Sequence, residues 1–294
     1  MPPKRDILAL VLDVARRDER VRAVALNGSR ANPNAPKDPF QDYDVVYIVS
    51  EMESFLRDPG WIDVFGERII LQTPEAMSLF PPELGGRFSY LMQFTDGSRI
   101  DLCLVPYEQR EAYCREDSLT QILLDKDGSL PSLPPASDRD YWVKRPTPAF
   151  FVDCCNEFWW VSPYVAKGLW RREMTYALDC LNSHVRPMLL QMLAWKVGAQ
   201  HEFRVSVGKS GKYLQRYLPE EDWQALLATY PAASYPAVWA ALFAATGLFR
   251  GAALNVAAAL AFHYNQEEDA RVSAFLDHIQ KLPDDVTEVF PNAE

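Results

Sequence analysis

The chain has 294 residues, 48% hydrophobic and 24% charged, which is typical of a globular protein with a sizeable core. Its net charge is −10 and it has no basic track, which argues against a nucleic-acid partner and favours a small cationic one. The five cysteines form no Cys-x-x-Cys pair and the four histidines are scattered, so neither a disulfide framework nor a zinc site is expected.

The start of the chain, residues 1–5, lacks the apolar segment of a signal peptide, and no run of 18 apolar residues follows. Residues 232–261 come closest, but Pro236, Arg250 and Asn255 interrupt them. We therefore expect a cytoplasmic protein that makes no use of a membrane. The sequence does not fix the oligomeric state, although a monomer is favoured.

Residues 6–17 carry apolar side chains at the spacing of an amphipathic helix, with Asp6 as its expected cap. Residues 21–26 are rich in Val and Ala and predict a short strand that ends at a Gly-Ser turn. Residues 32–39 contain three prolines, so they predict a loop. Residues 43–49 then predict a second, apolar strand.

Two aspartates open this second strand. Asp42 and Asp44 are two residues apart, so both carboxylates project from one face of an extended backbone. Their repulsion is costly unless a cation lies between them, and such a pair suits a hard divalent cation. The backbone N–H groups of Gly28 and Ser29 suit a phosphate, and Arg30 follows within reach of one.

Further strands are expected beyond the aspartate pair, at residues 61–65 and 68–72. Residues 88–95 and 98–105 flank Asp96-Gly97, a strong hairpin signal. Asp101 interrupts the apolar second arm of this hairpin, where burial without a partner is costly. It is therefore either an edge-strand residue that faces water or a third carboxylate of the same site.

Residues 127–140 are rich in Pro, Ser and Asp and predict an interdomain linker. Beyond them the pattern becomes helical and the strand signals fade. Separate helices are expected at residues 150–161, 163–184 and 187–197, the last two with a proline in the first turn.

The Gly-Ser turn, a 12-residue gap and Asp-x-Asp on the next strand resemble the nucleotidyltransferases of the DNA polymerase β type. At Asn27-Gly28-Ser29-Arg30-Ala31-Asn32-Pro33 and Phe40-Gln41-Asp42-Tyr43-Asp44 the chain is similar to the aminoglycoside 6-adenylyltransferases, the streptomycin-modifying branch. The resemblance continues in weaker segments at residues 99–102, 155–159, 164–169 and 207–213.

The resemblance implies an α+β fold, with a small mixed sheet flanked by helices and a C-terminal helical bundle. Residues 1–135 would form the nucleotidyltransferase domain, and residues 136–294 the helical domain that contributes the acceptor site. It also implies transfer of AMP from ATP to the 6-hydroxyl of streptomycin, with release of pyrophosphate and resistance to the antibiotic.

In this interpretation two Mg²⁺ ions stabilise the attacking and leaving oxygens. Asp42 and Asp44 would ligate both ions, while Gly28 and Ser29 hold the triphosphate. Asp101 either completes the metal site or accepts the proton of the attacking hydroxyl, and the sequence does not separate these roles.

The helical domain must supply cations for the triphosphate and anions for the drug. Lys167 is the preferred phosphate contact, with Lys209 and Lys212 as second choices. Asp153 and Glu157 are four apart on one helix, so their carboxylates lie together and suit guanidinium groups. The further candidates for drug contact are Trp159, Glu173 and Asp179.

Two alternatives stay open. The same transfer can serve another acceptor, such as a different aminoglycoside, a lincosamide or a protein side chain. The chain can also be a non-catalytic nucleotide-binding module, although retention of Asp42, Asp44 and Asp101 together argues against a decayed site.

Overall fold

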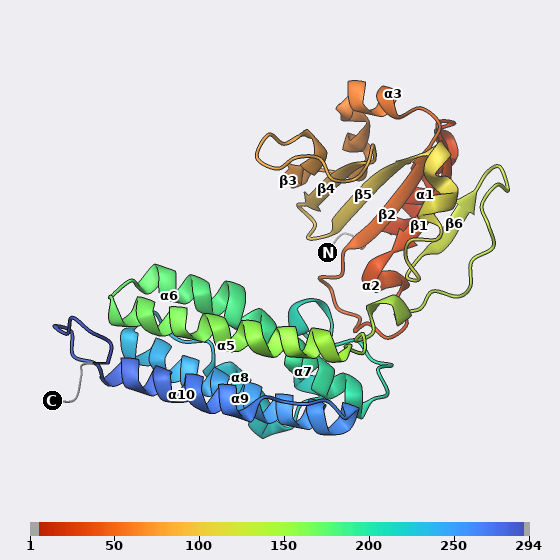
Figure 1. Cartoon of the computed structure of the whole chain (residues 1–294). Helices are drawn as coiled ribbons and strands as arrows, with labels where there is room; N and C mark the ends of the chain where they lie inside the picture. The colour runs from red at the N-terminus through yellow and green to blue at the C-terminus, as the bar shows by residue number, and fades with distance from the viewer. Residues whose placement is uncertain (1–5, 291–294) are drawn as a thin grey trace. The chain divides into compact units, whose positions relative to one another are not determined.

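The structure, a computed structural model, describes residues 6–290, so residues 1–5, used above to judge a signal peptide, lie outside it. The chain divides into two compact units, Met1–Asp140 and Tyr141–Glu294. This division falls close to the expected one at residues 135 and 136. The two units are described separately below (Figure 1).

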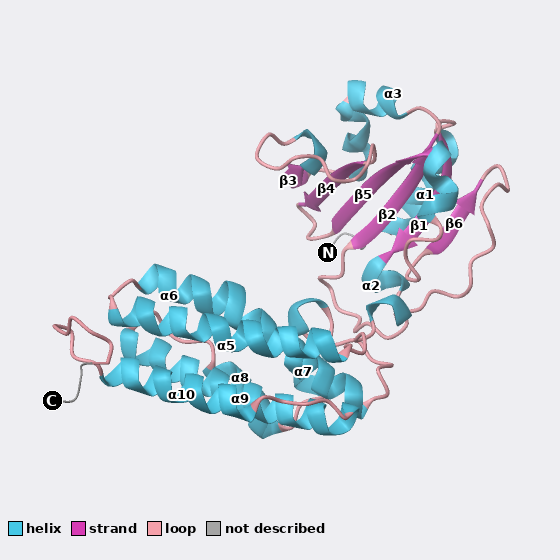
Figure 2. Ribbon diagram, in the orientation of Figure 1, coloured by secondary structure: helices cyan, strands magenta, loops and turns pink. Residues whose placement is uncertain are grey.

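The first unit is built on a six-stranded sheet in the order β3-β4-β5-β2-β1-β6 (Figure 2). The β2 and β5 strands are parallel, and every other neighbouring pair is antiparallel. The strands are β1 (Val21–Asn27), β2 (Tyr43–Val49), β3 (Arg68–Gln72), β4 (Phe88–Phe94), β5 (Arg99–Pro106) and β6 (Gln121–Asp125). This mixed sheet, together with the helical second unit, confirms the expected α+β fold class.

Helix α1 (Ile7–Arg17) packs on one face of the sheet, and Asp6 caps it as expected by accepting the N–H of Ala9. The Tyr47 hydroxyl of β2 donates to the carbonyl of Val11 at 2.6 Å, which ties the helix to the sheet. The opposite face is covered partly by α4 (Arg110–Tyr113). The other short α-helices of this unit are α2 (Gly28–Ala31) and α3 (Met52–Arg57).

The strand expected at residues 61–65 is wrong, because Pro59–Phe65 forms a 3₁₀ helix. The Asp58 carboxylate accepts the N–H of Gly60 and so caps the first turn. Ile62 and Phe65, three residues apart, are both buried, which is the spacing of a helix face and not of a strand. Local capping therefore outweighed the apolar, β-prone composition.

The hairpin expected around Asp96-Gly97 is confirmed by the antiparallel pairing of β4 and β5. Gly97 has φ +85°, a left-handed conformation that favours glycine. The Asp96 carboxylate accepts the N–H of Ser98 at 2.9 Å, which stabilises the turn.

The second unit is helical. Its α-helices are α5 (Pro148–Trp170), α6 (Met174–Cys180), α7 (Arg186–Gln200), α8 (Glu220–Ala228), α9 (Tyr235–Leu260) and α10 (Gln266–Lys281). The expected helix boundary at Pro163 is wrong, because α5 continues through this proline to Trp170. The chain turns instead near Arg172, which has φ +62°.

Helix α9 belongs to the core of this unit, where Phe249 stacks on Phe158 of α5 with ring centroids 3.8 Å apart. By length and composition α9 is the one helix in the described residues that is apolar enough to cross a membrane. Half of its most apolar window is buried inside the unit, as in the core helix of a globular protein.

A polar network links three helical segments of this unit. Arg250 donates to both oxygens of Asp269, which is 3% exposed, and the Tyr264 hydroxyl donates to the same carboxylate at 2.8 Å. The indole N–H of Trp159 donates in turn to the Tyr264 hydroxyl at 3.1 Å. The network therefore fastens α10 to both α9 and α5.

Asp269→Ala should lower the free energy of unfolding by about 2–3 kcal/mol, since it leaves Arg250 and Tyr264 without their shared acceptor. Glu267→Ala is the matched control on the same helix. Glu267 pairs with Arg271 in solvent, so this change should stay within about 0.5 kcal/mol. Urea unfolding measures both, and equal losses would show that the network adds nothing.

Candidate active site

The parallel pairing of β2 and β5 places Asp44 directly opposite Asp101. Neighbouring strands lie about 4.8 Å apart, and residues in register project to the same face. Asp42 immediately precedes β2 and shares the face of Asp44 by its spacing of two. The structure therefore brings together the three carboxylates that the sequence singled out.

Two of these carboxylates, those of Asp42 and Asp44, have a raised pKa, and burial is the main cause. Burial raises the pKa of Asp44 to about 6, with smaller contributions from the charges of Asp101 and Asp42. Burial also raises the pKa of Asp42, although the Arg99 guanidinium opposes this shift. The negative charge of the cluster is therefore not fully balanced by the positive groups around it.

One basic side chain of the same sheet lies among these acids. Arg99 donates to both oxygens of Asp101 at 2.8 and 2.7 Å, and its Nε lies 3.6 Å from Oδ2 of Asp42. Within residues 6–290, no group of three or more His, Cys, Asp or Glu side chains is arranged to hold a metal ion. The donor set nevertheless fits Mg²⁺, because it consists of hard oxygen ligands with uncompensated charge.

The Gly-Ser turn packs directly against this cluster. Gly28 follows β1 with φ +66°, and a Cβ added there would overlap Oδ2 of Asp44 and lie 2.8 Å from its Cγ. Only glycine allows the backbone of the turn to approach the carboxylate this closely. The glycine at this turn is therefore required both by conformation and by contact.

Arg30 is engaged by the loop that leads to Asp42. Its Nε donates to the carbonyl of Asp42 at 3.0 Å, one terminal N–H donates to the carbonyl of Gln41 at 2.7 Å, and its guanidinium stacks on Tyr43. Gln41 also donates to the carbonyl of Ser29 at 3.3 Å. Arg30 therefore positions Asp42, and its expected contact with a phosphate stays a prediction.

In the second unit, one exposed face of α5 carries several of the expected helical residues. Asp153 and Glu157 are exposed and lie one turn apart, and Trp160 follows on the same face with 63% of its surface exposed. Tyr164 and Lys167 continue the stripe, with Nζ of Lys167 5.4 Å from the Tyr164 ring centroid. Two anions, an exposed aromatic ring and a cation thus follow one another along α5.

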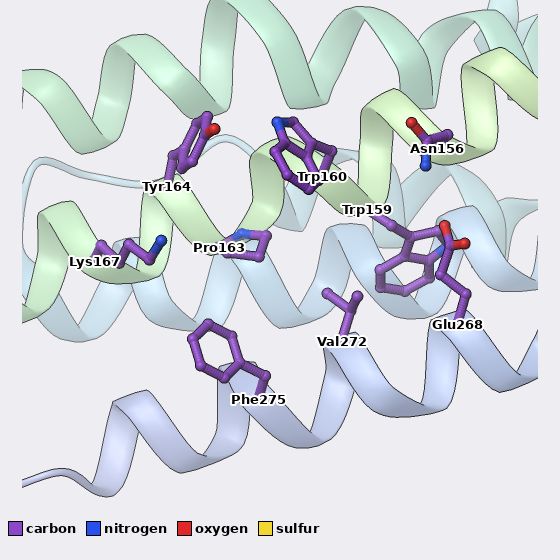
Figure 3. Close-up of a pocket in the computed structure, with 9 residues that line it drawn as sticks. All are labelled: Asn156, Trp159, Trp160, Pro163, Tyr164, Lys167, Glu268, Val272 and Phe275. Carbon is purple, nitrogen blue, oxygen red and sulfur yellow. The ribbon is translucent and has the colours of Figure 1, made fainter. Parts of the chain in front are cut away.

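The far part of this stripe lines a pocket of about 480 Å³ between α5 and α10 (Figure 3). Figure 3 shows Lys167 and Glu268 at opposite ends, with aromatic rings between them. The lining residues are Asn156, Trp159, Trp160, Pro163, Tyr164, Lys167, Glu268, Val272 and Phe275.

The other expected contacts lie outside this pocket or only at its wall. Trp159 is 1% exposed and its indole N–H is bonded to Tyr264, so it offers a ligand only part of its ring. Glu173 precedes α6, and Asp179 on α6 accepts a hydrogen bond from Ser183. The exposed Lys209 and Lys212 follow α7 in a separate segment.

Sequence reasoning gave no role to Arg99 or Glu268. Arg99 has a clear signal, since it stands two residues before Asp101 on the same strand face. Glu268 stands four residues before Val272 and seven before Phe275, a spacing that marks one face of the last helix. What the spacing does not reveal is that this face meets α5.

Known proteins resemble this chain along most of its length. The family model described as streptomycin adenylyltransferase matches residues 1–279. An aminoglycoside 6-adenylyltransferase of Bacillus subtilis (strain 168) is 46% identical over 265 residues, which are 90% of this chain and 93% of the relative. One of Campylobacter jejuni is 45% identical over 264 residues, 90% and 91% of the two chains.

A solved structure also matches. The crystal structure of an aminoglycoside 6-adenyltransferase from Bacillus subtilis is 41% identical in sequence. The match covers 94% of this chain and 98% of that one, with a TM-score of 0.48.

Proposed function

We propose that this chain, which belongs to the streptomycin adenylyltransferase family, transfers AMP from MgATP to the 6-hydroxyl of streptomycin and releases pyrophosphate. Family membership makes it a nucleotidyltransferase that acts on aminoglycosides with ATP as the donor. The observation that supports nucleotidyl transfer at this site is the register of Asp44 opposite Asp101, with the Gly28 turn against Asp44. The choice of streptomycin as acceptor is supported by the description of the family.

In the proposed reaction the substrate hydroxyl attacks the α-phosphorus and pyrophosphate leaves. Asp42 and Asp44, with Asp101, would hold Mg²⁺, which when bound neutralises charge on the attacking and leaving oxygens. The backbone N–H groups of Gly28 and Ser29 would hold the triphosphate. Asp101 serves either as a metal ligand or as the acceptor of the hydroxyl proton. Both roles need nearly the same position, so the position of Asp101 does not distinguish them.

Asp153 and Glu157 suit the acceptor, because paired carboxylates form charge-assisted hydrogen bonds with guanidinium groups. Trp160 offers an exposed ring beside them for cation–π stacking. Trp159, Glu173 and Asp179 stay further candidates for drug contact. We assign residues 1–140 to nucleotidyl transfer and residues 141–294 to acceptor recognition.

Lys167 is the preferred cation for the triphosphate, with Lys209 and Lys212 as second choices. Its place on the stripe beside Tyr164 leaves the ammonium in a pocket of mixed charge. We further propose that the protein works in the cytoplasm as a monomer and uses neither nucleic acid nor a membrane.

A pyrophosphate-release assay with MgATP and a panel of acceptors tests the proposal. Release that depends on streptomycin supports it, and analysis of the product by NMR identifies the modified hydroxyl. Release only with another aminoglycoside, a lincosamide or a protein would show that streptomycin is not the acceptor, while the transfer chemistry would stand. No release with any of them would favour a nucleotide-binding module.

Glu157→Gln should weaken streptomycin binding about tenfold and leave ATP binding unchanged, because it removes one charge-assisted hydrogen bond from the drug. Isothermal titration with each ligand alone measures the two affinities. Glu221→Gln, at an exposed position of α8, is the matched control. Equal weakening by both changes would mean that only the overall charge of the unit matters.

A further inference from the structure

Arg99 is the first residue of β5 and stands two residues before Asp101, so both side chains project from one face. Its guanidinium forms a fork with both oxygens of Asp101 and extends toward Asp42. In the described part of the chain, it is the only basic group in an ion pair with any of the three carboxylates. On β2, Asp44 lies opposite Asp101 in the parallel pair of strands.

In this arrangement Arg99 binds the same Asp101 oxygens that would ligate a metal ion. A bidentate guanidinium engages a lone pair on each oxygen of Asp101 and places its positive charge beside them, so a cation ligated by Asp101 competes with it. Arg99 and the nearby Arg30, whose charges both lower the pKa of Asp42 and Asp44, still leave three carboxylates with excess negative charge. The Arg99 side chain is 40% exposed, so water is available to it when it leaves.

We propose that Arg99 is an internal counter-ion, which stabilises the carboxylate cluster in the metal-free protein and competes with divalent cations for Asp101. This inference rests on the proposed function in one respect, namely that these carboxylates bind the metal. Arg99 thereby lowers the affinity of the site for the bare metal. It also stabilises the metal-free protein, because it reduces the repulsion among the three carboxylates. Removal of Arg99 must have opposite effects on the stability of the metal-free protein and on metal affinity.

Two other roles for Arg99 give different results. A purely structural ion pair predicts that its loss lowers stability equally with and without metal, while metal affinity stays the same. A direct phosphate contact predicts weaker nucleotide binding and an unchanged affinity for the bare metal. The sign of the change in metal affinity therefore separates the three roles.

The test is titration of Arg99→Gln with Mn²⁺ in the absence of nucleotide and drug, by calorimetry or by electron paramagnetic resonance. We expect Mn²⁺ to bind at least about fivefold more tightly than to the wild type, the lower end of common coupling strengths. In EDTA the variant should melt at a lower temperature, and Mn²⁺ should raise its Tm by more than it raises that of the wild type. Arg99→Lys keeps a charge without the fork and should fall between the two.

Arg68→Gln is the control, because Arg68 belongs to the same sheet but forms its ion pair with Asp63 and not with any of the three carboxylates. It should leave Mn²⁺ affinity unchanged. Unchanged or weaker Mn²⁺ binding by both Arg99 variants overturns the proposal, as does absence of Mn²⁺ binding by the wild type and both Arg99 variants alike. Since no drug or nucleotide is present, this result is independent of whether streptomycin is the acceptor.

Discussion

Asp44→Asn is expected to reduce kcat by about 10³-fold or more. Loss of the carboxylate that we propose as a metal ligand removes several kcal/mol of transition-state stabilisation, and each 1.36 kcal/mol is a factor of ten in rate. Asparagine has nearly the same size, so the contact with the Gly28 turn and the pairing with Asn27 on β1 persist. Single-turnover measurement of pyrophosphate release checks the rate.

The same substitution should stabilise the metal-free protein at neutral pH. The pKa of Asp44 is about 6 in the folded protein and 3.8 when unperturbed, so the folded state holds this proton more tightly than the unfolded state. The wild type therefore loses stability as pH rises from about 4 to 6, by roughly 1–3 kcal/mol at one shifted group. Asparagine does not titrate, so Asp44→Asn escapes this loss.

Urea unfolding in EDTA from pH 4 to 8 measures this effect. The advantage of Asp44→Asn over the wild type should be present above pH 6 and vanish near pH 4, where Asp44 is protonated in the folded protein. Asp13→Asn, in the exposed ion pair of α1 with Arg17, is the control and should show no comparable pH dependence. An Asp44→Asn protein with normal turnover would falsify the assignment of Asp44 to the metal.

Gly28→Ala is expected to lower kcat by about 10²-fold. The new Cβ overlaps the Asp44 carboxylate, so the turn and the carboxylate must move apart, and misplacement by about 1 Å has this order of effect. The left-handed φ of +66° adds strain of about 1–2 kcal/mol for a residue other than glycine. Steady-state kinetics and urea unfolding measure the two effects.

Gly97→Ala provides a control that separates strain from displacement. Gly97 has a similar left-handed φ of +85°, but a Cβ there meets nothing within 4 Å. It should lose stability and keep its kcat. If Gly28→Ala and Gly97→Ala have the same kcat, close contact between the turn and Asp44 does not matter for the reaction.

Local patterns predicted some of the fold and the shared strand face of two candidate site residues. Asp42 and Asp44 could be placed on one face because the two-residue period of a strand is a property of the backbone alone. The Asp96-Gly97 hairpin and the Asp6 cap also depend on neighbours within a few residues, and both are confirmed. Local reasoning was wrong for residues 61–65, where a cap and a helical burial spacing override strand-prone composition.

Along α5, sequence reasoning was less successful. Pro163 was expected to start a helix, yet it lies inside α5. Adjacent tryptophans look equivalent in the sequence, but Trp159 bonds to Tyr264 in the core while Trp160 is 63% exposed. The difference in exposure between the two tryptophans depends on which side of α5 the other helices cover. The sequence of α5 alone does not indicate that side.

The sequence by itself determined that a Gly-Ser turn precedes a strand with paired aspartates and that a helical region follows, because these features depend on neighbouring residues. Only the tertiary structure decided that Asp101 faces Asp44, that Arg99 lies among the acids, and that Glu268 closes a pocket on α5. Each of these depends on register or packing between segments far apart in the chain. The free energy that stabilises such a register or contact comes from burial of both segments together. The residues of one segment alone therefore do not specify it.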